Sequence, residues 1–481
     1  MLESFFAYFP KSAKLAVIFL SVIFSRYMFA FDGGEHALIG NLAFEKSTFT
    51  HPTFTPKNEL KNLETDMPFN YGQVVAMSGD MYVSVEEIAL SDPIILNGFF
   101  GRNRNSLKNC INIEIEAIYN DKVYSGCSDL VFAKKKLKYL TLAHDNYTHF
   151  AWHNIKKYVE FHTKALWFAK LAYLKCSDDQ WLENAQQCEA KSAILWKEVE
   201  SSGYREKLKS KYRKLPKLFP RRAFSQRYFI KLTKQQMIDL ALFTNGYADH
   251  FLTDAFSAGH LRVPRSQIDR FVSYYDIDLV TDSDDREEGT SLSGALTQLL
   301  HNTDGYLGGT KVTNSVGNEF ILRSDKQLFS LPDSTELSAD FEQNNQLQYP
   351  VDAVVHSLQE VFNVVVNGGD AMPKYAYKAL ELVPFIENAE QNSLATQIQA
   401  AIEDRGATKK IIDQMSDEMS LLFKAKLLIE DKSYKHYLQD FVDSIPQLMA
   451  EFREQVTMES ENELFKKRIP APLLENLRQM H

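Results

Sequence analysis

The stretch His250-Phe-Leu-Thr-Asp254-Ala-Phe-Ser-Ala-Gly259-His260 combines helical spacing with three side chains that can bind a metal ion. His250 and Asp254 are four residues apart, so on a helix they project from the same face, one turn apart. Gly259 stands where the helix can bend or end, which would bring His260 back toward that pair. Two imidazoles and a carboxylate suit zinc. The competing interpretation is a core histidine beside a surface aspartate and a surface histidine.

The sequence on both sides of this stretch is dominated by helical periodicity. Apolar residues recur at helical spacing in five segments, residues 140–174, 234–258, 292–301, 351–366 and 393–456. Strand-like alternation occurs mainly at residues 112–132, with a lesser piece near 311–322. We therefore predict a mainly α fold with a small β excursion.

Length and composition indicate a large globular protein. The chain has 481 residues, of which 44% are hydrophobic and 24% charged, enough for one big domain or two ordinary ones. A net charge of −9 argues against bulk attraction to nucleic acid, so no nucleic-acid partner is expected. Nothing in the sequence indicates an obligate protein partner.

The first 30 residues have the layout of a secretory signal. Lys11 and Lys14 precede a short apolar run at 15–24, and a possible cleavage point follows Ala30. The run is too short for a clear membrane span. We expect residues 1–30 to be a signal peptide and the protein to be secreted or periplasmic. An uncleaved N-terminal anchor is the alternative.

Cysteine usage agrees with export. The four cysteines, Cys110, Cys127, Cys176 and Cys188, form two pairs that each flank a short stretch of chain. Sequential pairing would close two local loops in an oxidising compartment. Four free thiols are the alternative.

Several other histidines and aspartates stand in helical segments or at the ends of elements. They are His36, Asp80, His149, His301 and Asp304. With these residues in order around it, the 250–260 stretch resembles the bacterial zinc-dependent phospholipases C, whose fold and three-zinc site are shared with the fungal single-strand nucleases. The family motif His-x3-Asp-x5-His is matched by residues 250, 254 and 260, and Phe-Ser-Ala-Gly-His-Leu-Arg-Val-Pro-Arg is similar to the phospholipase branch. The match runs from about residue 31 to residue 325.

The resemblance implies a helical domain at residues 31–330 that binds three zinc ions, followed by a helical C-terminal region at 331–481. One zinc would be held by the side chains of Asp80, His149, His250 and Asp254. Asp254 would bridge to a second zinc, bound by His36 and by the amino nitrogen and carbonyl oxygen of Phe31 as the mature N-terminus.

The third zinc would be held by His260 and His301 with Asp304 as the carboxylate. His356 and Glu360 are the rival to the last two residues, because they have the four-residue spacing that some family members use. His144 is the fallback for His149. Asn146 and Asp249 are candidates to orient the imidazoles.

The function implied is that of a secreted zinc phospholipase C. It would act on a phospholipid membrane surface or on lipid aggregates, releasing diacylglycerol and a phosphorylated headgroup. Asp80 would be both a ligand and the general base. A 3′-nucleotidase or single-strand nuclease on the same zinc site is an alternative, and a non-catalytic helical binding protein is another.

Overall fold

The computed structural model of the protein describes seven stretches of the chain. These are residues 33–90, 146–206, 231–274, 296–301, 310–323, 347–386 and 434–480, with short internal gaps at 48, 50, 52–53, 81, 83, 205, 298–299 and 371–374. Several predictions fall outside these residues: the signal peptide, the excursion at 112–132, the pair Cys110 and Cys127, and the candidates Phe31, His144 and Asp304.

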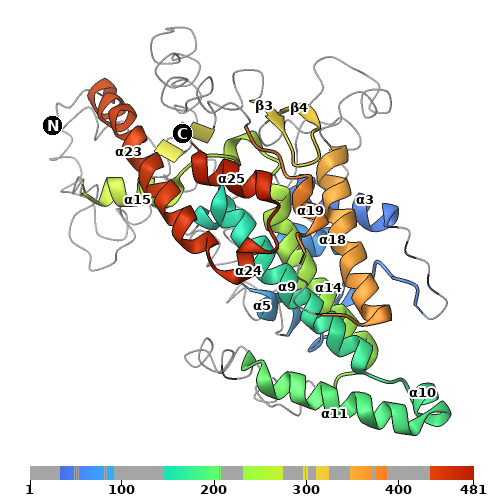
Figure 1. The fold of residues 1–481 in the computed structure, drawn as a ribbon. Helices are drawn as coiled ribbons and strands as arrows, with labels where there is room; N and C mark the ends of the chain where they lie inside the picture. The colour runs from blue at the N-terminus through green and yellow to red at the C-terminus, as the bar shows by residue number, and fades with distance from the viewer. Residues whose placement is uncertain are drawn as a thin grey trace, which may run out of the picture.

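Two long helices, α9 (Trp152–Leu174) and α14 (Lys234–Asp254), pack against each other through the middle of the molecule (Figure 1). α14 begins where Thr233 caps it: the Thr233 hydroxyl accepts a hydrogen bond from the Gln236 backbone, and the Gln236 side chain accepts one from the Thr233 backbone. Every residue of α14 from Met237 to Asp254 is buried. A helix buried on all sides needs neighbours on all sides.

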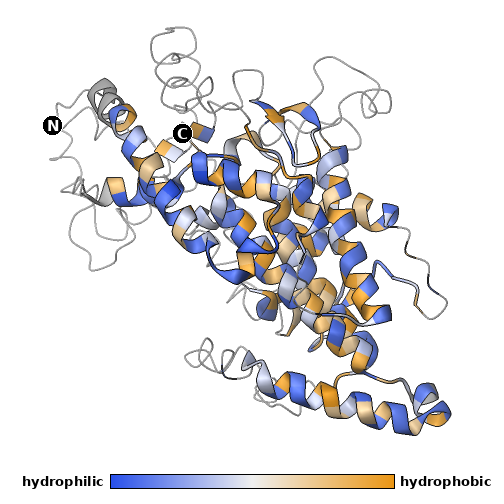
Figure 2. Ribbon diagram, in the orientation of Figure 1, coloured by the Kyte–Doolittle hydropathy of each residue, from blue (hydrophilic) through white to orange (hydrophobic). Residues whose placement is uncertain are grey.

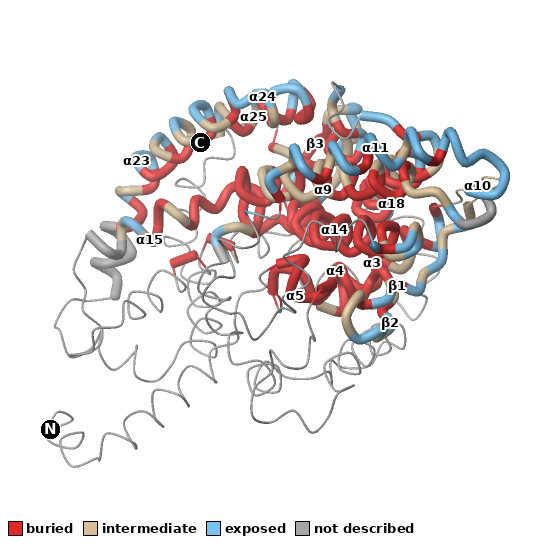
Figure 3. The backbone as a smooth tube through the Cα atoms, turned by 90° about the horizontal axis from the view of Figure 1, so that it is seen from below, coloured by how far each residue is buried: buried red, intermediate tan, exposed pale blue. Residues whose placement is uncertain are grey.

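Those neighbours come from distant parts of the chain. They are α3 (Gly33–Lys46), α4 (Tyr71–Met77), α5 (Val85–Ala89) and α18 (Gln348–Asn367). α18 has hydrophobic residues on one face and hydrophilic residues on the other (Figure 2). Its hydrophobic face packs on the core. Figure 3 shows α14 among buried residues, while α10 (Asp178–Glu183) and α11 (Ala185–Ser201) carry much of the exposed surface.

Strands are few and short in the part of the chain that the structure describes. β1 (Leu60–Lys61) pairs antiparallel with β2 (Pro68–Phe69), and β3 (Thr310–Thr313) pairs antiparallel with β4 (Glu319–Leu322). The second pair confirms the lesser strand-like piece expected near 311–322. With helices making up most of the described residues, the mainly α fold is confirmed.

The C-terminal helices share the core of the N-terminal ones. α19 (Lys378–Glu381), α23 (Tyr434–Ser460), α24 (Glu463–Lys466) and α25 (Ala471–Gln479) contribute residues such as Leu380, Phe452 and Leu473 to the same hydrophobic cluster as α9 and α14. The expected boundary near residue 330 lies outside the described residues. None of the described helices is long and apolar enough to cross a membrane.

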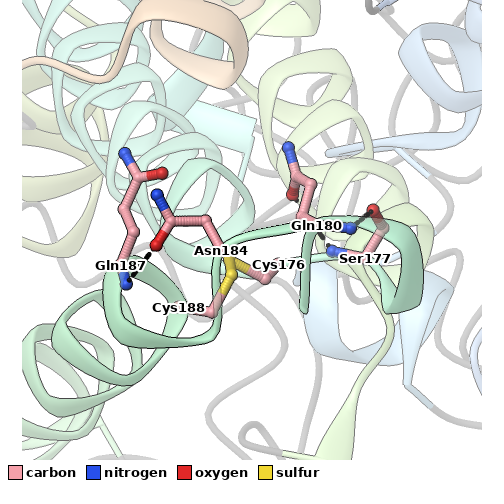
Figure 4. Close-up of a disulfide and its surroundings, with 6 residues drawn as sticks. All are labelled: Cys176, Ser177, Gln180, Asn184, Gln187 and Cys188. Carbon is pink, nitrogen blue, oxygen red and sulfur yellow. Dashed lines mark hydrogen bonds between the residues drawn. A yellow bond between two sulfur atoms is a disulfide. The ribbon is translucent and has the colours of Figure 1, made fainter. Parts of the chain in front are cut away.

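A disulfide joins Cys176 to Cys188, with a Cα–Cα distance of 5.8 Å (Figure 4). It ties the end of α9 to α11, across the short helix α10. Ser177 and Asn184, which lie between the two cysteines, cap α10 and α11 through hydrogen bonds with Gln180 and Gln187. Sequential pairing is therefore confirmed for this pair.

Candidate metal centre

The C-terminal end of α14 carries the first two candidate ligands. His250 and Asp254 are both fully buried, and Nε2 of His250 lies 3.8 Å from Oδ2 of Asp254. The helix therefore places them on one face, as the four-residue spacing predicts.

Two further histidines approach Asp254 from other parts of the chain. Oδ1 of Asp254 lies 3.4 Å from Nε2 of His36, which is on α3. Oδ2 lies 2.8 Å from Nδ1 of His149, which ends the 3-10 turn η2 (Asn146–His149). The two carboxylate oxygens of Asp254 thus face different imidazoles.

Asp80 completes this group from the turn that follows α4. Its Oδ1 lies 3.9 Å from Nε2 of His149, and its Oδ2 lies 3.9 Å from Nε2 of His250. The turn passes through Gly79, whose φ of +74° favours glycine. A Cβ on Gly79 would stand only 2.6 Å from the His250 ring, so the backbone here runs directly against an imidazole.

His149 lies outside the long helix that was expected to contain it. The prediction placed it in the first turns of a helix at 140–174, but α9 begins only at Trp152. Ala151 interrupts the helix with a φ of +49°, and its backbone nitrogen donates a hydrogen bond of 2.7 Å to the carbonyl oxygen of His260. This hydrogen bond joins residues more than 100 positions apart in the chain, and it stops α9 from extending back to His149.

His260 and His301 form a second pair beside this group. His260 is in the 3-10 turn η4 (Ala258–His260), and its ring centroid lies 5.2 Å from that of His301. Nδ1 of His260 donates to the carbonyl oxygen of His149 at 2.7 Å, which ties the pair to the first group.

Gly259 has a different role from the expected one. α14 already ends at Asp254, so this glycine does not end the helix. A Cβ on Gly259 would lie 2.1 Å from Cδ2 of His301. The glycine is needed because the His301 ring packs directly on the backbone at this position.

The protonation of these imidazoles suits metal binding. Burial lowers the pKa of both His149 and His250 well below its ordinary value, so both are neutral at pH 7. Nδ1 of His250 donates to the carbonyl oxygen of Val75 at 3.0 Å, so the proton of the neutral ring is on Nδ1. Nε2 of His250 then holds the lone pair of this ring, and it lies 3.2 Å from Nδ1 of His149, 3.8 Å from Oδ2 of Asp254 and 3.9 Å from Oδ2 of Asp80.

An arrangement of this kind fits a cation. Lone pairs on buried nitrogen and oxygen atoms repel one another unless a proton or a metal ion lies between them. Two sets of three ligand atoms each lie within 4.8 Å of one another, one from His36, His250 and Asp254 and the other from Asp80, His149 and His250. These buried histidines and aspartates could therefore hold a metal ion, with a backbone carbonyl fixing one tautomer as in known sites.

Glu360 of the rival pair contacts a different histidine. Glu360, on α18, has its Oε2 atom 2.8 Å from Nε2 of His162 on α9, so its side chain is hydrogen-bonded to a histidine that was not among the candidate ligands. Of the other candidate residues, Phe31, His144 and Asp304 lie outside the described residues.

Asp249 contacts groups other than an imidazole. It is fully buried and accepts hydrogen bonds from the hydroxyl of Ser357, the hydroxyl of Tyr71 and the side-chain amide of Asn245. Burial raises the pKa of its carboxyl to about 7, although these hydrogen bonds oppose the rise. Asp249 is a candidate to orient the imidazoles, but its hydrogen bonds to Tyr71 and Ser357 join α14 to α4 and α18. Asn146, the other such candidate, begins η2.

The comparisons with known proteins return no match. No protein-family model matches the chain, and no curated protein or solved structure matches it either.

Proposed function

We propose that this protein is a zinc-dependent phosphodiester hydrolase of the phospholipase C type. The observation that carries the proposal is the position of Asp254, whose two oxygens face His36 on one side and His149 with His250 on the other. A carboxylate in this position suits a bridge between two metal ions. Hydrolases that act on phosphodiesters use such two-metal sites.

The ligand chemistry favours a catalytic zinc site over a structural one. Structural zinc sites are closed by four ligands and are rich in cysteine thiolates. The described cluster contains histidines and aspartates alone. Cys176 and Cys188 are bonded to each other in a disulfide, so neither offers a thiolate ligand. His36, His149, His250 and Asp254 would hold two ions together with Asp80, and His260 and His301 would contribute to a third.

Bound zinc would supply a Lewis acid that acidifies a water molecule and neutralises charge on the phosphoryl oxygens. The chain itself supplies the proton acceptor. Asp80 is 7% exposed, while the other members of the cluster are between 0% and 4% exposed, so its carboxylate is the most accessible group there. We assign Asp80 the role of accepting the proton of the attacking water on a carboxylate oxygen.

A small pocket beside His260, lined mainly by apolar side chains, is the observation that we take to support a lipid substrate over a nucleic acid. Its walls include Ile155, Leu261 and Val383 together with Leu473, Leu477 and Met480. Among the described residues that line it, Phe385 is the one phenylalanine and there is no tyrosine or tryptophan, whereas single-strand nucleic-acid sites use aromatic side chains for base stacking. Glycerophospholipid, at a membrane surface or in an aggregate, is therefore the proposed substrate, and export is the matching proposal for location.

The test is hydrolysis by the exported protein, from which residues 1–30 are expected to be removed. Purified protein would be mixed with phosphatidylcholine vesicles, and soluble phosphorylated headgroup and diacylglycerol would be measured with and without a zinc chelator. We expect both products in equal amounts, loss of activity on chelation and recovery with zinc. Release of nucleotides from single-stranded nucleic acid, with none of headgroup, would contradict the substrate class. Full activity after complete zinc removal would contradict the zinc mechanism.

A further inference from the structure

Thr253 lies between the candidate ligands His250 and Asp254 on α14, but its side chain contacts a third candidate ligand, His36. Its Oγ1 atom is 2.7 Å from Nδ1 of His36, which is on α3. The same Oγ1 atom lies 2.9 Å from the carbonyl oxygen of Asp249 and 2.8 Å from that of His250. Thr253 and His36 are both fully buried, so no solvent competes for these contacts.

The direction of the hydrogen bonds follows from the inventory of donors. A hydroxyl has one proton, and a carbonyl oxygen can only accept. With two carbonyl oxygens within 2.9 Å, the hydroxyl proton of Thr253 lies toward one of them. The hydroxyl oxygen therefore accepts from Nδ1 of His36, so Nδ1 carries a ring proton.

This assignment determines which nitrogen of His36 faces the cluster as a ligand. With Nδ1 protonated, Nε2 holds the lone pair, and it is Nε2 that lies 3.4 Å from Oδ1 of Asp254. We propose that Thr253 is a positioning residue that holds His36 in the Nδ1-protonated tautomer and so prepares Nε2 to bind a metal ion. The catalytic meaning of this role rests on the proposed function, but the tautomer itself does not.

Thr253 differs from the groups that hold the imidazoles of His250 and His260. The carbonyl oxygen of Val75 holds His250, and that of His149 holds His260, so both rings are oriented by backbone atoms. No substitution removes a carbonyl oxygen. His36 is oriented by a side chain, which makes its tautomer open to a direct test by mutation. Side-chain partners of this kind typically contribute a factor of about 10 to 100 in metal affinity.

Thr244 provides a matched control on the same helix. It is fully buried, and its hydroxyl donates to the carbonyl oxygen of Leu240 at 2.6 Å, four residues earlier, as Thr253 does to Asp249. Thr244→Val and Thr253→Val therefore remove the same hydroxyl-to-helix bond in the same kind of surroundings. Only Thr253→Val removes the bond to His36.

The experiment uses metal-free full-length protein with 15N-labelled histidine. Long-range proton–nitrogen NMR correlations report which ring nitrogen carries the proton, and His36→Gln identifies the His36 signals. We expect His36 to be protonated on Nδ1 in the wild-type protein, in Thr253→Ser and in Thr244→Val. In Thr253→Val we expect both tautomers. Zinc affinity, measured by competition with a chelator, should fall about 10- to 100-fold in Thr253→Val alone.

Two results would overturn the inference. One is wild-type His36 with its proton on Nε2, which decides the matter even if a valine variant does not fold. The other is a Thr253→Val protein whose His36 tautomer and zinc affinity equal those of Thr244→Val. A shift of tautomer in a protein that hydrolyses no phosphodiester would support the positioning role of Thr253 and reject the proposed function, so the two can fail separately.

Discussion

His149 and Asp254 are 105 residues apart in the sequence, yet Nδ1 of His149 lies 2.8 Å from Oδ2 of Asp254. The contact depends on the break at Ala151, which turns the chain between η2 and α9 and is held by the carbonyl oxygen of His260. The cluster is therefore assembled by chain segments that each need the others in place. This dependence leads to predictions at several positions.

The backbone at Gly79 should tolerate no side chain. A Cβ there would lie 2.6 Å from the His250 ring, and the φ of +74° is unfavourable for other residues. We expect Gly79→Ala to lose about 1–2 kcal/mol from the backbone and about 1–3 kcal/mol more from the contact. Gly203→Ala is the control, because Gly203 has a φ of +61° with nothing within 4 Å of the added Cβ. Urea unfolding measures both, and equal losses in the two variants would reject the clash.

His301 should matter for metal binding, and His356 should not. His301 stacks against Gly259 beside His260, whereas His356 is on α18 together with Glu360, the partner of His162. We expect His301→Ala to lose part of the bound zinc and His356→Ala to keep all of it, by elemental analysis of the purified proteins. The reverse pattern would favour His356 and Glu360 as the last ligand pair.

Protonation of His153 should contribute to the pH dependence of the free energy of unfolding. Burial lowers the pKa of this imidazole from 6.5 to about 4. The unfolded chain takes up a proton below pH 6.5 and the folded one does not until about pH 4, so stability present above pH 6.5 is lost as the pH falls through this window.

We expect the wild-type protein to lose about 1.4 kcal/mol per pH unit more than His153→Gln across this window. Urea unfolding of the metal-free proteins at a series of pH values measures the difference. Parallel stability curves for the two proteins would show that His153 is protonated equally in the folded and unfolded states.

Removing the disulfide should affect stability more than the metal centre. α9 is 23 residues long, so Cys176 lies roughly 35 Å from the His149 end of this helix. The closed loop is short, with a sequence separation of 12, and we expect replacing both cysteines with serine to cost about 2–3 kcal/mol. Zinc content should remain that of the wild-type protein. Loss of zinc would show that the α10–α11 region supports the centre.

The sequence predicts those parts of the site that a single helix determines. His250 and Asp254 share a face because the spacing alone requires it, and strand alternation indicates a strand-like piece near 311–322, where the structure has the pair β3 and β4. Helical periodicity also places α9, α14 and α18 within a few residues at most ends. The exception is the start of α9, where a long-range hydrogen bond overrides the local pattern.

What the sequence leaves open depends on contacts between distant segments. The role of Gly259 depends on the His301 ring, and that of Asp249 depends on Tyr71 and Ser357. The sequence does not indicate a role for Thr253, because a threonine in a helix has no pattern of its own and its partner His36 is 217 residues away. The one available signal was its position between two candidate ligands.

The most direct test of the account is the zinc content of Asp254→Asn compared with Asp239→Asn. Both aspartates are on α14 and are buried, but Asp239 bonds to Gln235 and lies near the start of the helix. We predict about three zinc ions per chain in the wild-type protein and in Asp239→Asn, and a loss of at least one ion with Asp254→Asn, because an amide is a poor bridge between metals. Asp254→Asn protein with wild-type zinc content and wild-type hydrolysis would contradict the claim that Asp254 is the centre of the site.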